Sequence, residues 1–118
     1  MKVTINHVDK NVGTIFKKNA PAIDVTVEFT DTEKALLTRS GIDNQIFYTA
    51  PVHRHYTERM QHINYTAAEV QKEGLYVVFD DDITRRGEDV KIREALKHLK
   101  DAIDVAGTPI KTSDSFEL

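Results

Sequence analysis

The chain has 118 residues, of which 40% are hydrophobic and 30% are charged, and its formal net charge is −3. This length and composition suit one globular domain that buries enough apolar surface to fold without a metal or a disulfide. The negative charge argues against binding to nucleic acid, because such binding draws its affinity from Lys and Arg on phosphates. The absence of cysteine excludes a disulfide framework, a thiolate zinc site and a cysteine nucleophile.

No targeting or membrane segment is indicated by the sequence. The stretch from Met1 to His7 has no apolar core of the kind that a signal peptide carries. No apolar run approaches the roughly 20 residues that span a bilayer. We therefore expect a cytoplasmic protein that makes no contact with a membrane.

The first quarter of the chain is typical of strands. Val3 and Ile5 alternate with polar residues and predict a strand, followed by a turn at 9–11 and a short returning strand over 13–16. Residues 17–21 are a polar break that ends in a proline. Residues 22–30 then show a strict period of two, which predicts a strand with one face in the core. Its inward residues are Ile23, Val25, Val27 and Phe29.

Two helices are predicted by their start and stop signals. Thr30 and Glu33 have the spacing of a capping box, and Gly41 is placed to end the helix that they begin. Thr66 and Glu69 repeat that spacing ahead of a short helix from Ala67 to Glu73, which stops at Gly74.

Three further segments are predicted to be strands. Ile46 to Val52 is rich in β-formers, and Pro51 places it at an edge or near a strand end. Arg59 to Tyr65 is expected to be its hairpin partner. Leu75 to Phe79 is a continuous apolar run, which favours a central strand covered on both faces.

The last element is a long amphipathic helix. Its apolar residues recur at helical spacing, and Gly107 and Pro109 end it. They are Ile92, Ala95, Leu96, Leu99, Ala102, Ile103 and Ala106. The fold class is therefore α+β. We expect a mainly antiparallel sheet of about five to six strands, with this helix packed on one face and one or two shorter helices. Residues 1–107 form a single domain, and 108–118 form a tail that Ile110 or Phe116 could anchor.

A histidine cluster is the first candidate site. On a strand His53 and His55 point to the same side, so two imidazoles can face one metal ion. Glu58 or His62 would supply a third ligand, which leaves an open position for zinc or another divalent transition metal. The pattern is slightly similar to the His-x-His…Glu motif of cupins, but only two residues separate His55 from Glu58, and we assign no family. The alternative is a polar hairpin end.

An acidic run is the second candidate site. Asp80, Asp81 and Asp82 follow the buried run directly, and carboxylates at a strand end can bind a divalent cation. Further ligands would be Glu88 and Asp89, with Arg85 and Arg86 on a phosphate group of a bound ligand. The alternative is a charged turn that stops the sheet from extending.

No catalytic constellation stands out, so the leading hypothesis is a non-enzymatic protein-interaction module that self-associates. Its partner would be a second copy, as a homodimer, or another protein. The aromatic residues Phe47, Tyr48, Tyr56 and Tyr65 suggest an edge for pairing. A metal-binding protein or metal-dependent enzyme that uses the histidine cluster is the alternative. A phosphate-ligand protein that uses residues 80–82 is a third hypothesis.

Overall fold

The computed structural model describes residues 1–12, 18–52 and 61–108. The elements, in chain order, are β1 (Lys2–Val12), β2 (Lys18–Glu28), α1 (Asp31–Ser40), a 3-10 turn η1 (Ile42–Asn44), β3 (Ile46–Val52), β4 (Gln61–Thr66), α3 (Ala67–Glu73), β5 (Leu75–Val78) and α4 (Asp82–Gly107). All described strand pairs are antiparallel. The expected α+β class with antiparallel strands and a long C-terminal helix is confirmed.

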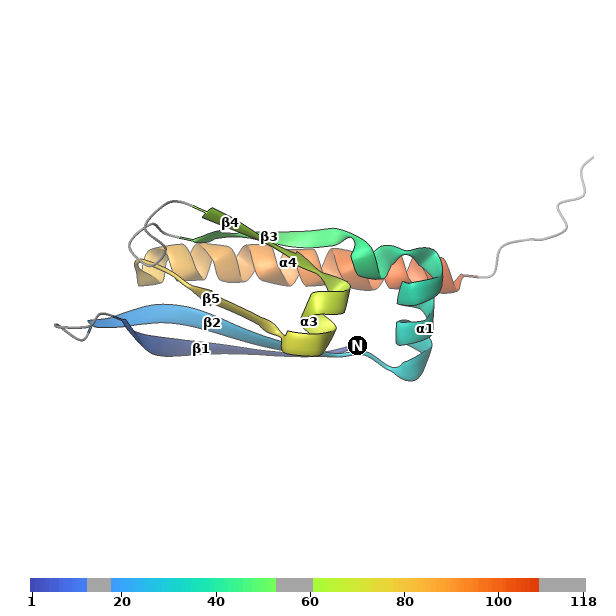
Figure 1. The fold of residues 1–118 in the computed structure, drawn as a ribbon, viewed down its shortest axis with the longest axis horizontal. Coiled ribbons are helices and arrows are strands. Elements are labelled where there is room, and N and C mark those ends of the chain that lie inside the picture. Colours follow the sequence, from blue (N-terminus) through green and yellow to red (C-terminus); the bar gives the residue numbers. More distant parts are fainter. Residues whose placement is uncertain (13–17, 53–60, 109–118) are drawn as a thin grey trace, which may run out of the picture.

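The described strands form two sheets rather than one (Figure 1). One sheet has three strands in the order β1-β2-β5, and the other pairs β3 with β4. The expectation of five to six strands in a single sheet is wrong, because β3 lies near β5 without a backbone ladder between them. A side chain joins the sheets instead: the hydroxyl of Tyr65 donates to the carbonyl of Tyr76 at 3.2 Å.

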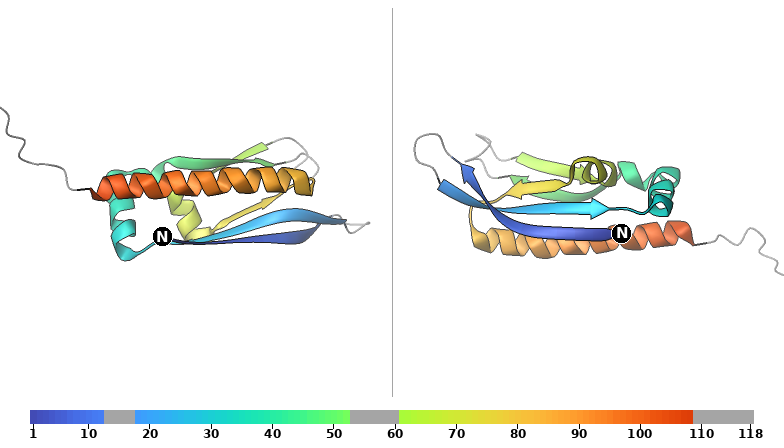
Figure 2. Two further views of the ribbon diagram at one scale, coloured as in Figure 1. Left: turned by 180° about the vertical axis from the view of Figure 1, so that it is seen from behind. Right: turned by 90° about the horizontal axis from the view of Figure 1, so that it is seen from below.

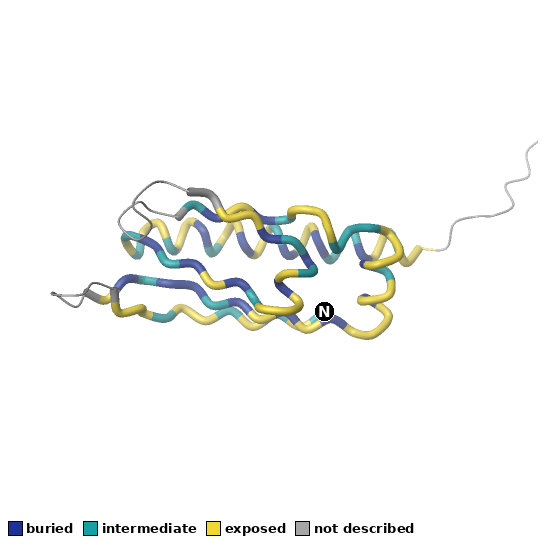
Figure 3. The backbone as a smooth tube through the Cα atoms, in the orientation of Figure 1, coloured by how far each residue is buried: buried dark blue, intermediate teal, exposed yellow. Residues whose placement is uncertain are grey.

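Helix α4 packs against both sheets. It contacts β2 of the larger sheet, β3 of the smaller one and the short helix α1. Figure 2 shows it running along one side of the strands, with α1 near its C-terminal end. The buried residues form one continuous core, and Figure 3 shows them on the inward sides of the strands and of α4. The largest fully buried side chains are Phe79, Ile23, Leu37, Leu75, Ile92 and Ile103. Each contributes about 1.5–3 kcal/mol through its burial.

The β1–β2 hairpin is longer than the sequence indicated. Its register runs without a shift from Lys2 opposite Glu28 to Val12 opposite Lys18. The turn expected at 9–11 and the polar break expected at 17–21 are therefore wrong, since residues 9–11 and 18–21 lie inside strands. The short strand expected over 13–16 lies outside the described residues.

Pro21 fits inside β2 because of the direction in which its backbone points. Its carbonyl accepts from the N–H of Phe79 at 2.8 Å, so Pro21 faces the β5 side of the sheet. The β2–β5 ladder begins only at the next residue, with Ala22 opposite Val78. The N–H that proline lacks is therefore not one that the pairing with β1 requires.

Strand β5 is an edge strand of its sheet, and the expectation of a central strand is wrong. Leu75 and Val77 are buried, but Tyr76 between them is 42% exposed. Only one face of β5 is covered, and β2 takes the central position. A continuous apolar run does not distinguish a central strand from an edge strand when its outward residue is a tyrosine, whose hydroxyl tolerates water.

The helix caps follow the sequence signals. Thr30 and Glu33 form both hydrogen bonds of the capping box, at 3.1 and 2.9 Å, and Gly41 ends α1 in the left-handed conformation. The hydroxyl of Thr66 caps α3. Helix α4 begins a full ten residues before its first apolar core position, because Asp81 caps it by accepting from the N–H of Thr84 at 2.7 Å.

Candidate functional site

A groove of about 490 Å³ lies between β1 and α4. Met1, Val3 and Ile5 line it from the β1 side, and Leu96 lines it from the helix. The helix also contributes three cationic side chains, which are Arg93, Lys97 and Lys100. These three follow each other at spacings of four and three residues, so they lie along one face of α4. The groove combines an apolar floor with a basic wall.

The charges on the basic wall are only partly compensated. The guanidinium of Arg93 contacts Asp89 at 2.5 Å, and the ammonium of Lys100 contacts Asp104 at 2.6 Å. The hydrogen bond to Asp104 is the main reason that the pKa of Lys100 is raised. Lys97 has no ion-pair partner within the described part of the chain. An anionic group in the groove would therefore find one unpaired ammonium.

Strand β1, which lines the groove, has 11 residues and pairs with β2 alone among the described strands, so its other edge is an outer edge of the sheet. The direction of Pro21 fixes which β1 groups point outward. In an antiparallel pair the N–H and C=O of alternate residues face opposite sides. Pro21 is opposite Asp9 and its carbonyl faces away from β1, so the backbone groups of Asp9 face away from β2. Val3, Ile5 and His7 alternate in step with Asp9 along the strand, so their backbone groups also face away from β2. No described strand pairs with them.

A buried carboxylate lies next to the Met1 end of the groove, where it lines a second hollow. Glu33 is 6% exposed, and its Oε1 lies 2.7 Å from the α-amino nitrogen of Met1. Its other oxygen lies 3.5 Å from the ammonium of Lys100. Burial alone would raise the pKa of Glu33, but the α-amino group and the hydrogen bonds with Thr30 outweigh it. Together they lower the pKa to about 2.

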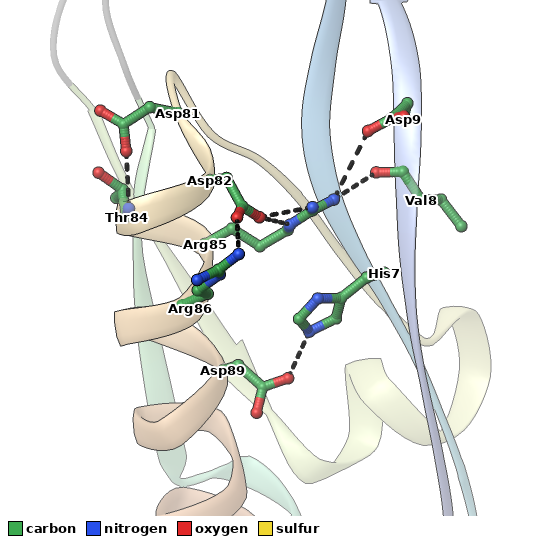
Figure 4. A network of polar contacts seen from close by, with 9 residues as sticks. All are labelled: His7, Val8, Asp9, Asp81, Asp82, Thr84, Arg85, Arg86 and Asp89. Carbon is green, nitrogen blue, oxygen red and sulfur yellow. Dashed lines mark hydrogen bonds and ion pairs between the residues drawn. The ribbon is translucent and has the colours of Figure 1, made fainter.

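The other end of β1 is tied to the first turns of α4, as Figure 4 shows. The guanidinium of Arg85 donates to the carbonyl of Val8 at 3.1 Å and lies 3.6 Å from Asp9. Asp82 accepts from Arg85 at 2.6 Å and contacts Arg86 at 2.7 Å. These hydrogen bonds and charges lower the pKa of Asp82, with the bond from Arg85 the main cause. Both ends of β1 are therefore attached to helices, and the groove lies between the attachments.

His7 and Asp89 form an exposed pair beside this network. His7 Nε2 lies 2.5 Å from Asp89 Oδ2 (Figure 4). Arg93 binds the other oxygen of the same carboxylate. Burial works to raise the pKa of Asp89, but Arg93 and then His7 lower it. A histidine paired with an aspartate is two-thirds of a catalytic triad, which also needs a nucleophile bonded to the imidazole. His7 has no second partner among the described residues, so the described residues do not complete a triad.

The predicted acidic site is dispersed in the structure. Asp81 is the cap of α4, and hydrogen bonds from Thr84 lower its pKa. Glu88 is bonded to Tyr48 of β3, whereas Asp89 reaches β1 on another side of the helix. Within 1–12, 18–52 and 61–108, no three acids or histidines are grouped so that they could hold a metal ion. A cation or phosphate site at residues 80–82 stays a prediction.

The predicted histidine cluster falls mainly where the structure gives no description. His53, His55 and Glu58 lie outside the described residues. His62 is in β4, opposite Pro51, and nothing is described of its side chain. The metal site and its divalent ion therefore stay a prediction.

The aromatic residues near β3 and β4 belong to the core. Tyr48 and Tyr65 are buried, with ring centroids 6.2 Å apart and an interplanar angle of 26°. The hydroxyl of Tyr48 donates to the buried Glu88 at 2.9 Å. Burial, followed by that carboxylate, raises the pKa of Tyr48 far above its ordinary value. The expectation of an exposed aromatic edge at these two residues is wrong, and Tyr56 lies outside the described residues.

Sequence reasoning missed the groove. The spacing of Arg93, Lys97 and Lys100 was a usable signal, but acids between them made the helix face look evenly mixed in sign. A comparison of the chain with protein-family models, curated proteins and solved structures finds no match in any of the three. Among the described helices, none combines the length and the apolar character needed to cross a membrane.

Proposed function

We propose that the protein is a non-enzymatic protein-interaction module that self-associates through the outer edge of β1. The observation that supports this is the length of that edge, since the 11 residues of β1 pair on one side only among the strands that the structure describes. Unpaired N–H and C=O groups on an edge strand are a template for another strand. Natural edges are usually kept short or bulged, and the β1–β2 register has no bulge.

A second copy of β1 is a suitable partner strand. Two copies related by a twofold axis would pair antiparallel, and each would satisfy the outward groups of the other. We favour the register that sets Ile5 opposite Ile5 and Val3 opposite His7, because these are outward-facing residues. Shifting each strand so that Ile5 meets His7 would place Lys2 opposite Lys10, and like charges in that position are destabilising.

Light scattering and amide hydrogen exchange test the proposal together. At low micromolar concentration we expect a monomer in which the amides of Val3, Ile5 and His7 exchange freely. At high concentration the mass doubles and these three amides become protected, while the exchange of their neighbours Thr4 and Asn6 changes little. A protein that stays monomeric at every concentration contradicts the proposal, as does a dimer that protects amides elsewhere.

A proline variant provides the matched control. Ile5→Pro removes one outward N–H but no donor to β2, so it abolishes association and leaves the hairpin folded. Ile5→Val keeps the N–H and a similar shape, so it associates as the unmodified chain does. Equal association of the two variants would show that β1 is not the interface.

A further inference from the structure

We propose that the groove between β1 and α4 binds a free medium-chain carboxylate, a small molecule with one anionic head on an unbranched apolar chain. Three properties of the described residues that line the groove support this: the sign of their charges, the apolar floor and the length of the lining. The binding does not depend on the self-association proposed above, so either proposal can fail without the other.

The groove is positive although the chain as a whole is negative. The chain has 19 acidic and 16 basic residues, yet the three charged side chains that line the groove are all basic. The second hollow differs, since Glu33 and Asp104 line it together with Lys100. The lining of a third hollow, which includes Phe47 and His98, contains no Lys, Arg, Asp or Glu. An anion is therefore attracted to the groove rather than to the other two hollows.

The charge left over on the basic wall is that of one ammonium group. The guanidinium of Arg93 and the ammonium of Lys100 each contact an aspartate four residues away on α4. Lys97 has no ion-pair partner among the described residues. A carboxylate carries one negative charge and would compensate Lys97 alone. A phosphate monoester, with about 1.5–2 negative charges at pH 7, would exceed that charge.

The floor of the groove is apolar and rests on the core. Val3 and Ile5 are two residues apart on β1, so they project from the same face of the strand. Both pack against the core but keep part of their surface in water. Leu96 lines the groove from α4 and is 3% exposed. An alkyl chain laid on this floor removes apolar surface of both partners from water, which favours binding.

The size of the groove sets the size of the ligand. Its volume of about 490 Å³ lies in the range of small-molecule sites. From Met1 to Ile5 the strand rises about 13 Å, at about 3.3 Å per residue. From Arg93 to Lys100 the helix rises about 10 Å, at about 1.5 Å per residue. With C–C bonds of about 1.5 Å, an extended chain of roughly eight to ten carbons matches these lengths.

The direction of the ligand follows from the helix. Side chains on a helix lean toward its N-terminus, which brings the ammonium of Lys97 toward the Arg93 end of the wall. We therefore expect the carboxylate at that end and the tail running toward Met1, which lines the groove beside Lys100.

Methyl spectra recorded during a titration with decanoate test the site directly. The protein is kept at a concentration at which light scattering shows a monomer, and decanoate is kept below its critical micelle concentration. We expect saturable shifts in the methyl signals of Val3, Ile5 and Leu96. The methyl signals of Ile46, which is 56% exposed but lines the third hollow, serve as the internal control. Equal shifts at Ile46, or no saturable shifts in the groove, would overturn the proposal.

Matched ligands separate the head from the tail. Decanol keeps the tail without the charge and should bind about tenfold more weakly, because it loses a charge-assisted contact. Decylammonium has the wrong charge and should not bind. Hexanoate lacks four methylenes and should also bind at least tenfold more weakly, at roughly 0.8 kcal/mol per buried methylene. Equal affinity for decanol and decanoate contradicts the role of the basic wall, and equal affinity for hexanoate contradicts that of the floor.

Charge variants test the assignment of Lys97. Lys97→Glu should abolish decanoate binding, and Lys97→Gln should weaken it about tenfold. Lys34→Glu is the matched control, because Lys34 is exposed on α1, does not line the groove and gives the same change in net charge as Lys97→Glu. This control should bind decanoate as the unmodified chain does. An equal loss of binding in Lys97→Glu and Lys34→Glu would reveal a general charge effect and contradict the proposed site.

Two further results separate the ligand site from other occupants and from the proposed function. Binding to phosphatidylglycerol vesicles without binding to monomeric decanoate would assign the groove to a membrane surface and overturn the proposal. A protein that dimerises through β1 but binds no decanoate refutes the ligand site alone. A protein that binds decanoate and stays monomeric at every concentration supports the ligand site and refutes only self-association.

Discussion

Replacing Glu33 by glutamine should remove a part of the folding stability that the protein loses in acid. The amide of glutamine can still accept from the N–H of Thr30, so the capping box survives. The variant loses the charge that faces the α-amino group of Met1 and the ammonium of Lys100. The change therefore tests the ion pairs at a nearly constant shape.

The magnitude follows from the pKa of the carboxyl group. That pKa falls from an ordinary 4.5 to about 2 in the folded chain. This difference corresponds to up to about 3 kcal/mol of folding free energy. Because the folded pKa is depressed, the contribution is complete above pH 4.5 and is lost as the pH falls through about 2. In the Glu33→Gln variant this dependence is absent, so the two stability curves converge in acid.

Urea denaturation between pH 7 and pH 2 measures both curves. The chain needs a free α-amino group at Met1, and an N-terminally acetylated sample serves as a second way to remove that charge. We expect the unmodified protein to exceed the variant by up to about 3 kcal/mol at pH 7 and by little at pH 2. Other carboxyls with lowered pKa values contribute equally to both proteins. Parallel curves over this range would refute the assigned role of Glu33.

Substitutions at four further positions probe single contacts, with stability measured by urea or thermal denaturation. Gly74→Ala should destabilise by about 1–3 kcal/mol, because φ is 76° and the new Cβ would lie 2.8 Å from a carbonyl oxygen of β2. Gly87→Ala, in open space on α4, should instead stabilise by about 0.5–1 kcal/mol, and equal signs for the two would contradict the geometry. Tyr48→Phe removes the hydroxyl that donates to Oε2 of the buried Glu88 and leaves that carboxylate with Lys91, at 3.5 Å from its other oxygen, so it should cost about 1–3 kcal/mol. In the unmodified protein, an absorbance titration should show the Tyr48 phenol still protonated well above pH 10. Asp81→Ala should cost about 1 kcal/mol of α4 capping, whereas Asp81→Asn should be nearly neutral.

The parts of the fold that sequence reasoning predicted are those set by neighbouring residues. The cap at Thr30, the left-handed Gly41 and the strand Ile46–Val52 all depend on spacings of a few residues. The long helix was predicted from its apolar stripe, although its first turns carry no such stripe. Their signal was the single capping residue Asp81, which also suits a charged turn.

The parts that failed depend on contacts between distant segments. Whether β5 is central or at an edge is decided by its neighbours, and its four residues contain no information on the strand that lies beside them. The buried bond between Tyr48 and Glu88 joins residues 40 positions apart. The groove needs β1 and α4 from opposite ends of the chain. Local pattern cannot supply any of these pairings.

The single side-chain bond between Tyr65 and Tyr76 has a consequence for how the molecule opens. In one continuous sheet, freeing β3 and β4 would break a row of backbone bonds to β5. Here the β3–β4 ribbon can detach from the rest by losing that bond, the hydrogen bond from Tyr48 to Glu88 of α4, and its apolar contacts with the core and α4. Its amide protons should therefore exchange through a partial opening that leaves β2 shielded. We therefore expect the β3–β4 ribbon to open separately from the sheet of β1, β2 and β5.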